Sequence, residues 1–269
     1  MEEKENSYII NGGEEGKIRL KVLSDLLSQN TKSLLEIYGP ITGLKVLDIG
    51  CGGGDVSLMA AKMVSDTGSV VGVDFDKEII CLAEQDALKN RVNNVSFQVL
   101  DVVDISFNNE FDIVFSRFLM SHLNQPLKAL NKMLKSLKVG GKIITEDVQF
   151  SGHFCHPPCL AFEKYIQFYA DLARSRKQNS EIGLSLFELF RQAGIKNINF
   201  DVIQPCFNKG EGKWMAYITL DKIKETLIKE KLADRETIQQ VLKELEDFTK
   251  DETTIISLPR IFRVWGVKE

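Results

Sequence analysis

Carboxylates and glycines with the spacing of a ligand site follow short apolar segments in the first half of the chain. Asp48 directly precedes a glycine-rich run that contains Gly50, Gly52 and Gly54. Asp74 and Asp101 close the next two apolar segments. Glycines let the backbone turn tightly and approach a ligand without an intervening side chain. Since an acid at a strand end can accept hydrogen bonds from ribose hydroxyls, these residues predict a pocket for a nucleoside.

The elements that must position these residues alternate between strand and helix. Apolar runs predict strands over residues 45–49, 69–74, 95–100, 111–116 and 142–146, and helical patterns cover residues 56–64, 77–89 and 126–138. Buried strands separated by helices are typical of a parallel, doubly wound sheet. Ligands bind at the carboxyl ends of such strands. The acids and the glycine turn are therefore expected at one edge of the sheet.

Helical segments flank and interrupt this pattern. Residues 14–38 predict helix, with a cap near Asn30 or Thr31, and we expect residues 1–40 to form a helical lead-in or lid. Residues 41–269 are expected to form one domain with helical insertions at about 151–194 and 208–250. Asp234 is the expected cap of the last helix. Strands are predicted over residues 197–204, and over 254–267 as a final strand or hairpin.

The composition is that of a globular protein without a nucleic-acid signature. Of the 269 residues 43% are hydrophobic and 27% charged, and the net charge is −4. Nucleic-acid binding usually requires a basic surplus, so we expect no nucleic-acid partner. No apolar run reaches the roughly 18 residues that indicate a membrane span. Five scattered cysteines and an acidic, polar start favour a cytoplasmic protein. The sequence leaves the oligomeric state open.

Residues 44–148 resemble the core of class I S-adenosylmethionine-dependent methyltransferases. The similarity rests on motifs in the expected order, namely Asp48–Gly54, Asp74, Asp101, Phe111–Ser116 and Gly140–Ile144. It implies a Rossmann-like, mostly parallel sheet of seven strands whose last strand is antiparallel. It also implies S-adenosyl-L-methionine as the cofactor, so that residues 41–269 would be the methyltransferase domain.

The resemblance assigns roles to residues around the turn. Asp48 would orient the methionine end of the cofactor near its ammonium group, and Asp74 would bind the ribose. The remaining expected cofactor contacts are Phe75 beside the adenine, Asp101 and Val102 at its amino group, Ser116 at the end of the fourth strand, and Tyr8 and Arg19 in the lid. Arg19 would pair with the methionine carboxylate, although it can equally be a solvated helix residue.

Residues after the fourth and fifth strands are candidates for the methyl acceptor. His122 would act as a general base if the acceptor must lose a proton, or it packs the following helix. The expected acceptor pocket consists of Glu146, His153, Phe162, Tyr165 and Tyr169, each of which can instead belong to the core or cap backbone. The short cluster of histidines and cysteines at 153–159 is too tightly spaced for a paired-ligand zinc site. We therefore expect no metal, with metalloid methylation as a minor alternative.

Two other classes of function remain open at this stage. A nicotinamide-dependent oxidoreductase would need glycine at the sixth position counted from Gly50, where the chain has Asp55. That carboxylate would oppose a pyrophosphate at the start of the helix. A nucleoside-binding module without catalysis would keep the same pocket. The chain lacks the Pro-Pro-aromatic motif associated with adenine or glutamine methylation, which favours a small, partly apolar acceptor.

Overall fold

The computed structural model describes residues 13–269. Its centre is a seven-stranded sheet in the order β3-β2-β1-β4-β5-β10-β7, and β10 runs antiparallel to both neighbours. The strands are β1 (Lys45–Ile49), β2 (Ser69–Asp74), β3 (Val95–Val99), β4 (Phe111–Arg117), β5 (Leu137–Gln149), β7 (Lys196–Ile203) and β10 (Arg260–Val267). The predicted doubly wound, mostly parallel sheet with an antiparallel last strand is confirmed.

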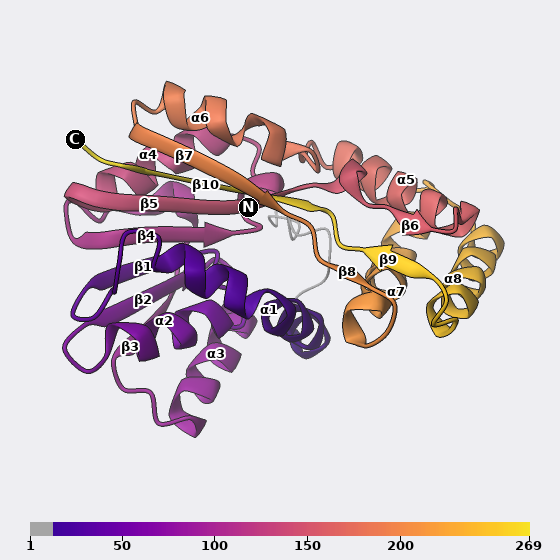
Figure 1. Ribbon diagram of the computed structural model, residues 1–269, viewed down its shortest axis with the longest axis horizontal. Helices are drawn as coiled ribbons and strands as arrows, with labels where there is room; N and C mark the ends of the chain where they lie inside the picture. The colour runs from indigo at the N-terminus through magenta and orange to yellow at the C-terminus, as the bar shows by residue number, and fades with distance from the viewer. Residues whose placement is uncertain (1–12) are drawn as a thin grey trace.

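Helices cover both faces of this sheet (Figure 1). The end of α1 (Gly13–Leu35) and α2 (Asp55–Val64) pack on one face, with α3 (Lys77–Lys89) beside them, and α4 (Pro126–Ser136) and α6 (Leu186–Gln192) cover the other. Val46 of β1 is buried in the first layer and its neighbour Leu47 in the second. Because successive side chains of a strand point to opposite faces, a central strand covered on both sides is apolar at nearly every position.

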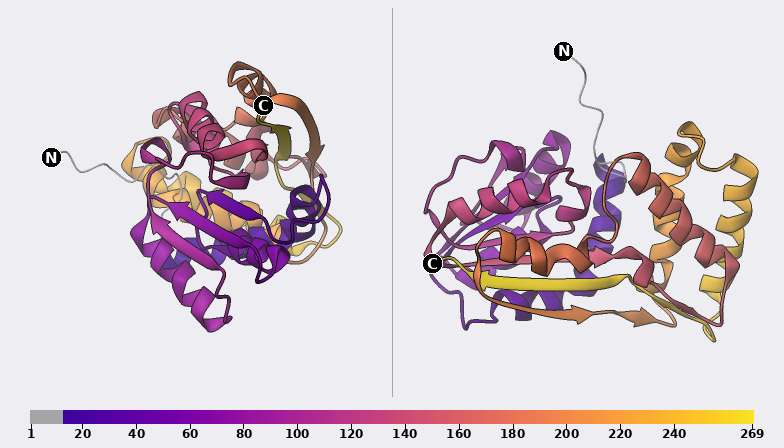
Figure 2. Two further views of the ribbon diagram at one scale, coloured as in Figure 1. Left: turned by 90° about the vertical axis from the view of Figure 1, so that its left-hand side faces the viewer. Right: turned by 90° about the horizontal axis from the view of Figure 1, so that it is seen from above.

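A group of helices, here called the helical cap, extends beyond the carboxyl ends of the parallel strands (Figures 1 and 2). It consists of α5 (Leu160–Ser175), α7 (Met215–Lys229) and α8 (Arg235–Lys250), which share a core of their own. Asp234 caps α8 as predicted, because its carboxylate accepts a hydrogen bond from the Thr237 N–H at 2.7 Å. A small sheet of β6 (Cys155–His156), β9 (Ile255–Ser257) and β8 (Cys206–Phe207) borders the cap. Among the described helices, none has both the length and the apolar character needed to cross a bilayer.

Two local predictions were wrong. The first helix does not begin anew at Asn30 or Thr31 but runs unbroken to Leu35. Thr31 is buried inside the helix, where its hydroxyl donates to Glu146 at 2.8 Å and accepts from Arg117 at 3.1 Å, so its polar group is satisfied without a cap. The three-stranded sheet was also missed, since strands of two or three residues are too short to show a period in the sequence.

Candidate active site

The turn between β1 and α2 has a backbone that favours glycine. Gly50, Gly52 and Gly54 have φ values of 70°, 51° and 80°, in the left-handed region that other residues rarely adopt. A Cβ atom at Gly54 would also lie 2.8 Å from a ring carbon of Phe97. The Gly50 N–H donates to the carbonyl of Val73 at 2.8 Å, which fixes the turn against the end of β2. The turn therefore lies where a ligand can approach its backbone.

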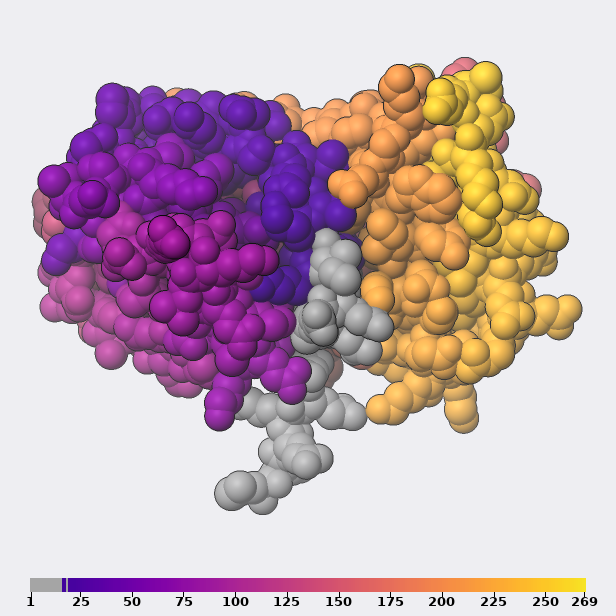
Figure 3. Space-filling model, turned by 90° about the horizontal axis from the view of Figure 1, so that it is seen from below, coloured from indigo at the N-terminus to yellow at the C-terminus, as the bar shows by residue number. Residues whose placement is uncertain are grey.

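Helix α1 packs over this turn. A Cβ atom at Gly52 would lie 3.3 Å from Leu20 Cδ1, and one at Gly53 would lie 3.4 Å from Lys17 Cγ. Lys17 also forms an ion pair with Asp86 of α3 at 2.7 Å. In the space-filling view α1 lies between the sheet side of the molecule and the orange and yellow helices of the cap (Figure 3). The cavity on this side of α1, here called the main cavity, is thus bounded by the sheet, by the helical cap and by α1 itself.

Asp48 and Asp74 line this cavity beside the glycine turn. Both are buried, and Asp74 accepts hydrogen bonds from the N–H groups of Gly52 (3.0 Å) and Asp76 (3.1 Å). Asp48 accepts a hydrogen bond from the Ser57 hydroxyl at 2.6 Å. Burial raises the pKa of Asp48 to about 6, although Ser57 and the nearby Arg117 favour the ionised form. A buried carboxylate of this kind gains stability from a cationic ligand.

A second, smaller cavity adjoins the first and shares Gly50, Asp74 and His122 with it. Its other walls include Phe75, Asp101 and Val102, together with apolar residues from β1 and from the loop after β4. The Asp101 carboxylate accepts a hydrogen bond from the Val103 N–H at 3.1 Å. The structure thus brings the three residues predicted for adenine into one recess, next to the acid predicted for ribose.

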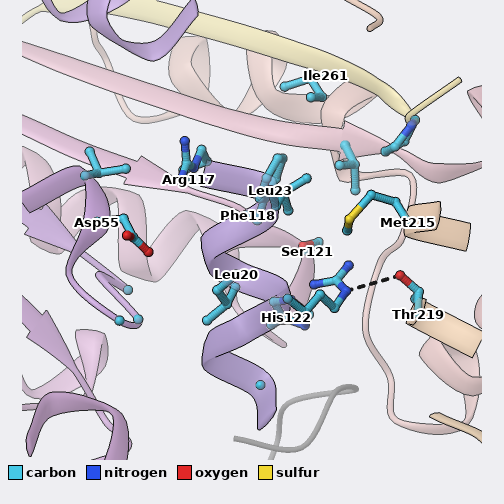
Figure 4. A pocket seen from close by; sticks show the side chains of 18 of the residues that line it. Leu20, Leu23, Asp55, Arg117, Phe118, Ser121, His122, Met215, Thr219 and Ile261 are labelled. Carbon is cyan, nitrogen blue, oxygen red and sulfur yellow. Dashed lines mark hydrogen bonds between the residues drawn. The ribbon is translucent and has the colours of Figure 1, made fainter. Parts of the chain in front are cut away.

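The other end of the main cavity is aromatic and apolar. One side is lined by Tyr165 and Tyr169 of α5 with His153 and Phe150. Another is lined by Met215 and Thr219 of α7 with Leu258, Pro259 and Ile261. The Phe150 ring stacks on Tyr169 with the ring centroids 3.8 Å apart, and lies edge-on to His153 at 4.5 Å. Figure 4 shows Met215 and Thr219 across the cavity from Asp55 and Arg117, which lie toward the glycine turn.

Some predicted residues lie behind the cavity wall. Phe162 is 1% exposed and packs edge-on to His153 with the centroids 5.9 Å apart, so it supports the wall from the cap core. Ser116 is buried between strands, where its hydroxyl donates to Thr145 at 3.3 Å. Glu146 accepts from Thr31 and lies near Arg117, beneath α1. Tyr8 lies outside the described residues.

His122 lies where the two cavities meet. Burial lowers its pKa to about 4, and the charge of Arg19 acts in the same direction, while a hydrogen bond with Gln178 opposes them. The imidazole is therefore uncharged at neutral pH. A base whose pKa is this low accepts a proton less readily than an ordinary histidine.

Several lining residues were missed in the sequence. Arg117 lies at the end of β4, donates to Thr31 and lies over the Phe118 ring at 5.8 Å. The rule that functional residues follow strand ends would have identified it. No such rule identifies Met215 and Thr219, because only tertiary packing brings α7 to the cavity.

Comparisons with known proteins agree with this geometry. A family model for methyltransferase domains matches residues 42–180, about half of the chain. A methyltransferase of Schizosaccharomyces pombe is 26% identical over 210 residues, which cover 74% of each chain. Aklanonic acid methyltransferase of a Streptomyces species is 34% identical over 125 residues, which cover 46% of this chain but only 57% of that relative.

Among solved structures, a phosphoethanolamine N-methyltransferase of Haemonchus contortus, in complex with phosphomonomethylethanolamine and S-adenosylhomocysteine, superimposes with a TM-score of 0.57. It is 20% identical, and the match covers 92% of this chain and 56% of the other.

The fold and the similarity to these methyltransferases together identify a Rossmann-like enzyme that uses S-adenosylmethionine. The chain belongs to the methyltransferase domain family, as a class I S-adenosylmethionine-dependent methyltransferase. The residues present suit this cofactor, because buried Asp48 favours a cation and Asp55 begins α2 where a dinucleotide would place its phosphates. The nicotinamide alternative is therefore not favoured.

Proposed function

We propose that the enzyme methylates an oxygen, nitrogen or carbon atom of a small, partly apolar molecule bound between the glycine turn and the helical cap. The observation that carries this proposal is the lining of the main cavity, whose cap end is formed mainly by aromatic and aliphatic side chains with a few polar groups. A partly enclosed cavity with an apolar lining and few polar groups is typical of small-molecule sites. The name of the Streptomyces relative, which acts on aklanonic acid, supports the same class of acceptor. We expect no nucleic-acid substrate.

In this proposal the sheet edge holds the cofactor. Asp48 faces its ammonium group, Asp74 binds the ribose hydroxyls, and the recess of Phe75, Asp101 and Val102 holds the adenine. The Arg117 guanidinium, near Asp48 at the end of β4, binds the methionine carboxylate. Glycines at the turn allow the methionine portion to lie against the backbone.

The cofactor supplies an electrophilic methyl group on a sulfonium. A lone pair of the acceptor forms the new bond to carbon while the carbon–sulfur bond breaks and its electrons remain on sulfur. The contribution of this chain is to align the acceptor and exclude water. If the attacking atom carries a proton, His122, which lies where the two cavities meet, is the residue that accepts it.

Calorimetry and a transfer assay test the proposal. We expect the protein to bind S-adenosylhomocysteine and to show no heat with NADH. It should then transfer a labelled methyl group from S-adenosylmethionine to a low-molecular-weight fraction of a metabolite extract. Label found only in protein or nucleic acid would contradict a small acceptor, and binding without any transfer would favour a nucleoside-binding module.

A further inference from the structure

Arg19 of α1 faces the acceptor end of the cavity. Its Nε donates to the Thr219 hydroxyl of α7 at 3.1 Å, the contact drawn as a dashed line in Figure 4. Arg19 lines the main cavity together with Tyr165 and Tyr169 of α5. The guanidinium thus lies among side chains of the cap, while the other arginine of the cavity, Arg117, lies near the glycine turn.

The charge of Arg19 has no carboxylate partner among the described residues. Burial lowers the pKa of Arg19, and the groups that oppose this shift are the hydroxyls of Tyr169 and Tyr165. Both phenols are themselves neutral near pH 7, since burial raises the pKa of Tyr169 to about 12 and that of Tyr165 further. Elsewhere in the described chain, Arg176 forms an ion pair with Glu230 and Arg263 one with Asp201, and Arg117 lies near the carboxylates of Asp48 and Glu146.

Among the residues that the structure describes, no neighbour of Arg19 supplies the missing negative charge. His122 and His153 are uncharged at neutral pH, because burial, together with the charge of Arg19, lowers the pKa of each to about 4. Asp147 interacts with Tyr169 but lies behind the lining, where it accepts from the N–H groups of Ser121 (3.1 Å) and Val148 (2.8 Å). A desolvated cation without a counter-charge is costly to the folded protein. An anionic ligand would remove this cost.

We propose that the methyl acceptor is an anion, a carboxylate on an apolar body, and that Arg19 is the residue that selects it. This inference rests on the proposed small-molecule function and narrows it. The aromatic side chains around Arg19 fit the apolar body, and the fork of the guanidinium fits two carboxylate oxygens. The methionine carboxylate of the cofactor has the same chemistry, but Arg117 lies nearer to its expected place beside Asp48.

Probe pairs of similar size and shape, each a carboxylate and its uncharged amide, test the proposal. The full-length protein, saturated with S-adenosylhomocysteine, is titrated in a calorimeter with benzoate, benzamide, 2-naphthoate and 2-naphthamide. We expect at least one carboxylate to bind about ten-fold or more tightly than its amide, the size typical of a hydrogen-bonded charge. In Arg19→Met this preference should disappear, and in Arg19→Lys it should return in part. Arg191→Met, on an exposed arginine of α6 paired with Glu188, should keep the full preference.

The binding of S-adenosylhomocysteine separates the outcomes. If it binds wild type and Arg19→Met alike, the cofactor site is intact and the probes report on the acceptor end. The inference is overturned if no carboxylate binds more tightly than its amide, or if the preference survives in Arg19→Met. It is also overturned if Arg19→Met weakens the binding of S-adenosylhomocysteine about ten-fold, because Arg19 would then bind the cofactor. Failure of wild type to bind S-adenosylhomocysteine would instead contradict the proposed cofactor site.

Discussion

The carboxylate of Asp48 is almost completely removed from water, with 2% of the residue exposed, and burial raises its pKa from 3.8 to about 6. A change of this size means that ionised Asp48 costs the folded apoprotein about 3 kcal/mol at neutral pH. Asp48→Asn keeps an oxygen that can accept the Ser57 hydrogen bond but removes the charge. Because the buried amide also has a desolvation cost, we expect the variant to be more stable than wild type by about 1–2 kcal/mol at pH 7.5.

The effect has a defined dependence on pH. The folded-state pKa of Asp48 lies above its unfolded value, so the destabilisation is fully present above pH 6 and is lost as the pH falls toward 4. At pH 5 the electrostatic cost of Asp48 falls to about half, so the stability gain of Asp48→Asn should shrink by about 1.5 kcal/mol and nearly disappear. Binding should change in the opposite sense, since the variant offers no charge to the ammonium group. We expect S-adenosylhomocysteine to bind about ten-fold more weakly at pH 7.5.

Urea unfolding at pH 7.5 and pH 5, with calorimetry at pH 7.5, measures these effects. Asp112→Asn is the control: burial opposes its ionisation, but hydrogen bonds from Lys138 and from the Lys45 N–H lower its pKa overall. This control should therefore lose stability at pH 7.5 and keep cofactor affinity. A stability gain of Asp48→Asn that is absent at pH 7.5, or equal at both pH values, would refute the electrostatic reasoning.

Three further substitutions, one of them with a matched control, test the site. Asp74→Ala should weaken S-adenosylhomocysteine binding by about 1–3 kcal/mol in calorimetry, and unchanged affinity would remove its ribose role. Gly54→Ala should lower the free energy of unfolding by roughly 2–4 kcal/mol, because the residue has a positive φ and the new Cβ would contact Phe97. The control Gly140→Ala also has a positive φ but no atom within 4 Å of the new Cβ, so it should lower the free energy of unfolding by only about 1 kcal/mol. His122→Ala should slow turnover less than about ten-fold, and a loss of 100-fold or more would assign it as the base.

Local patterns were sufficient to predict the sheet and its acids. The strands β1, β2 and β4 are mostly apolar runs bounded by turn residues, whereas β3 alternates apolar and polar residues. The predicted ends of all four differ from the structure by no more than a residue. The strand β5 is longer than expected, because Gly140 and Gly141 lie within it rather than before it. A central strand that has helices on both faces must be apolar whichever elements cover it. Its sequence pattern can therefore be recognised without knowing which elements are its neighbours.

The acceptor end of the main cavity could not be predicted from local sequence patterns. Its walls come from α1, α5, α7 and three residues near the start of β10 (Leu258, Pro259 and Ile261), which are far apart in the chain. The apolar residues of α5 and α7 also form the cap core, so their spacing indicates a buried helix face without indicating a cavity. That Phe162 packs behind His153 while Tyr165 reaches the lining depends on how α5 is rotated, which a helical period alone does not determine.

Helix α1 joins the two ends of the site, which predicts coupled binding. Leu20 lies against the glycine turn and its neighbour Arg19 contacts Thr219 of the cap. A cofactor that orders α1 against the turn also orders Arg19, so part of the entropic cost of binding the acceptor is removed. The coupling must be reciprocal. We therefore expect 2-naphthoate to bind several-fold more tightly in the presence of S-adenosylhomocysteine, and S-adenosylhomocysteine to gain the same factor from 2-naphthoate. Equal dissociation constants with and without the second ligand would show that α1 transmits nothing between the two ends.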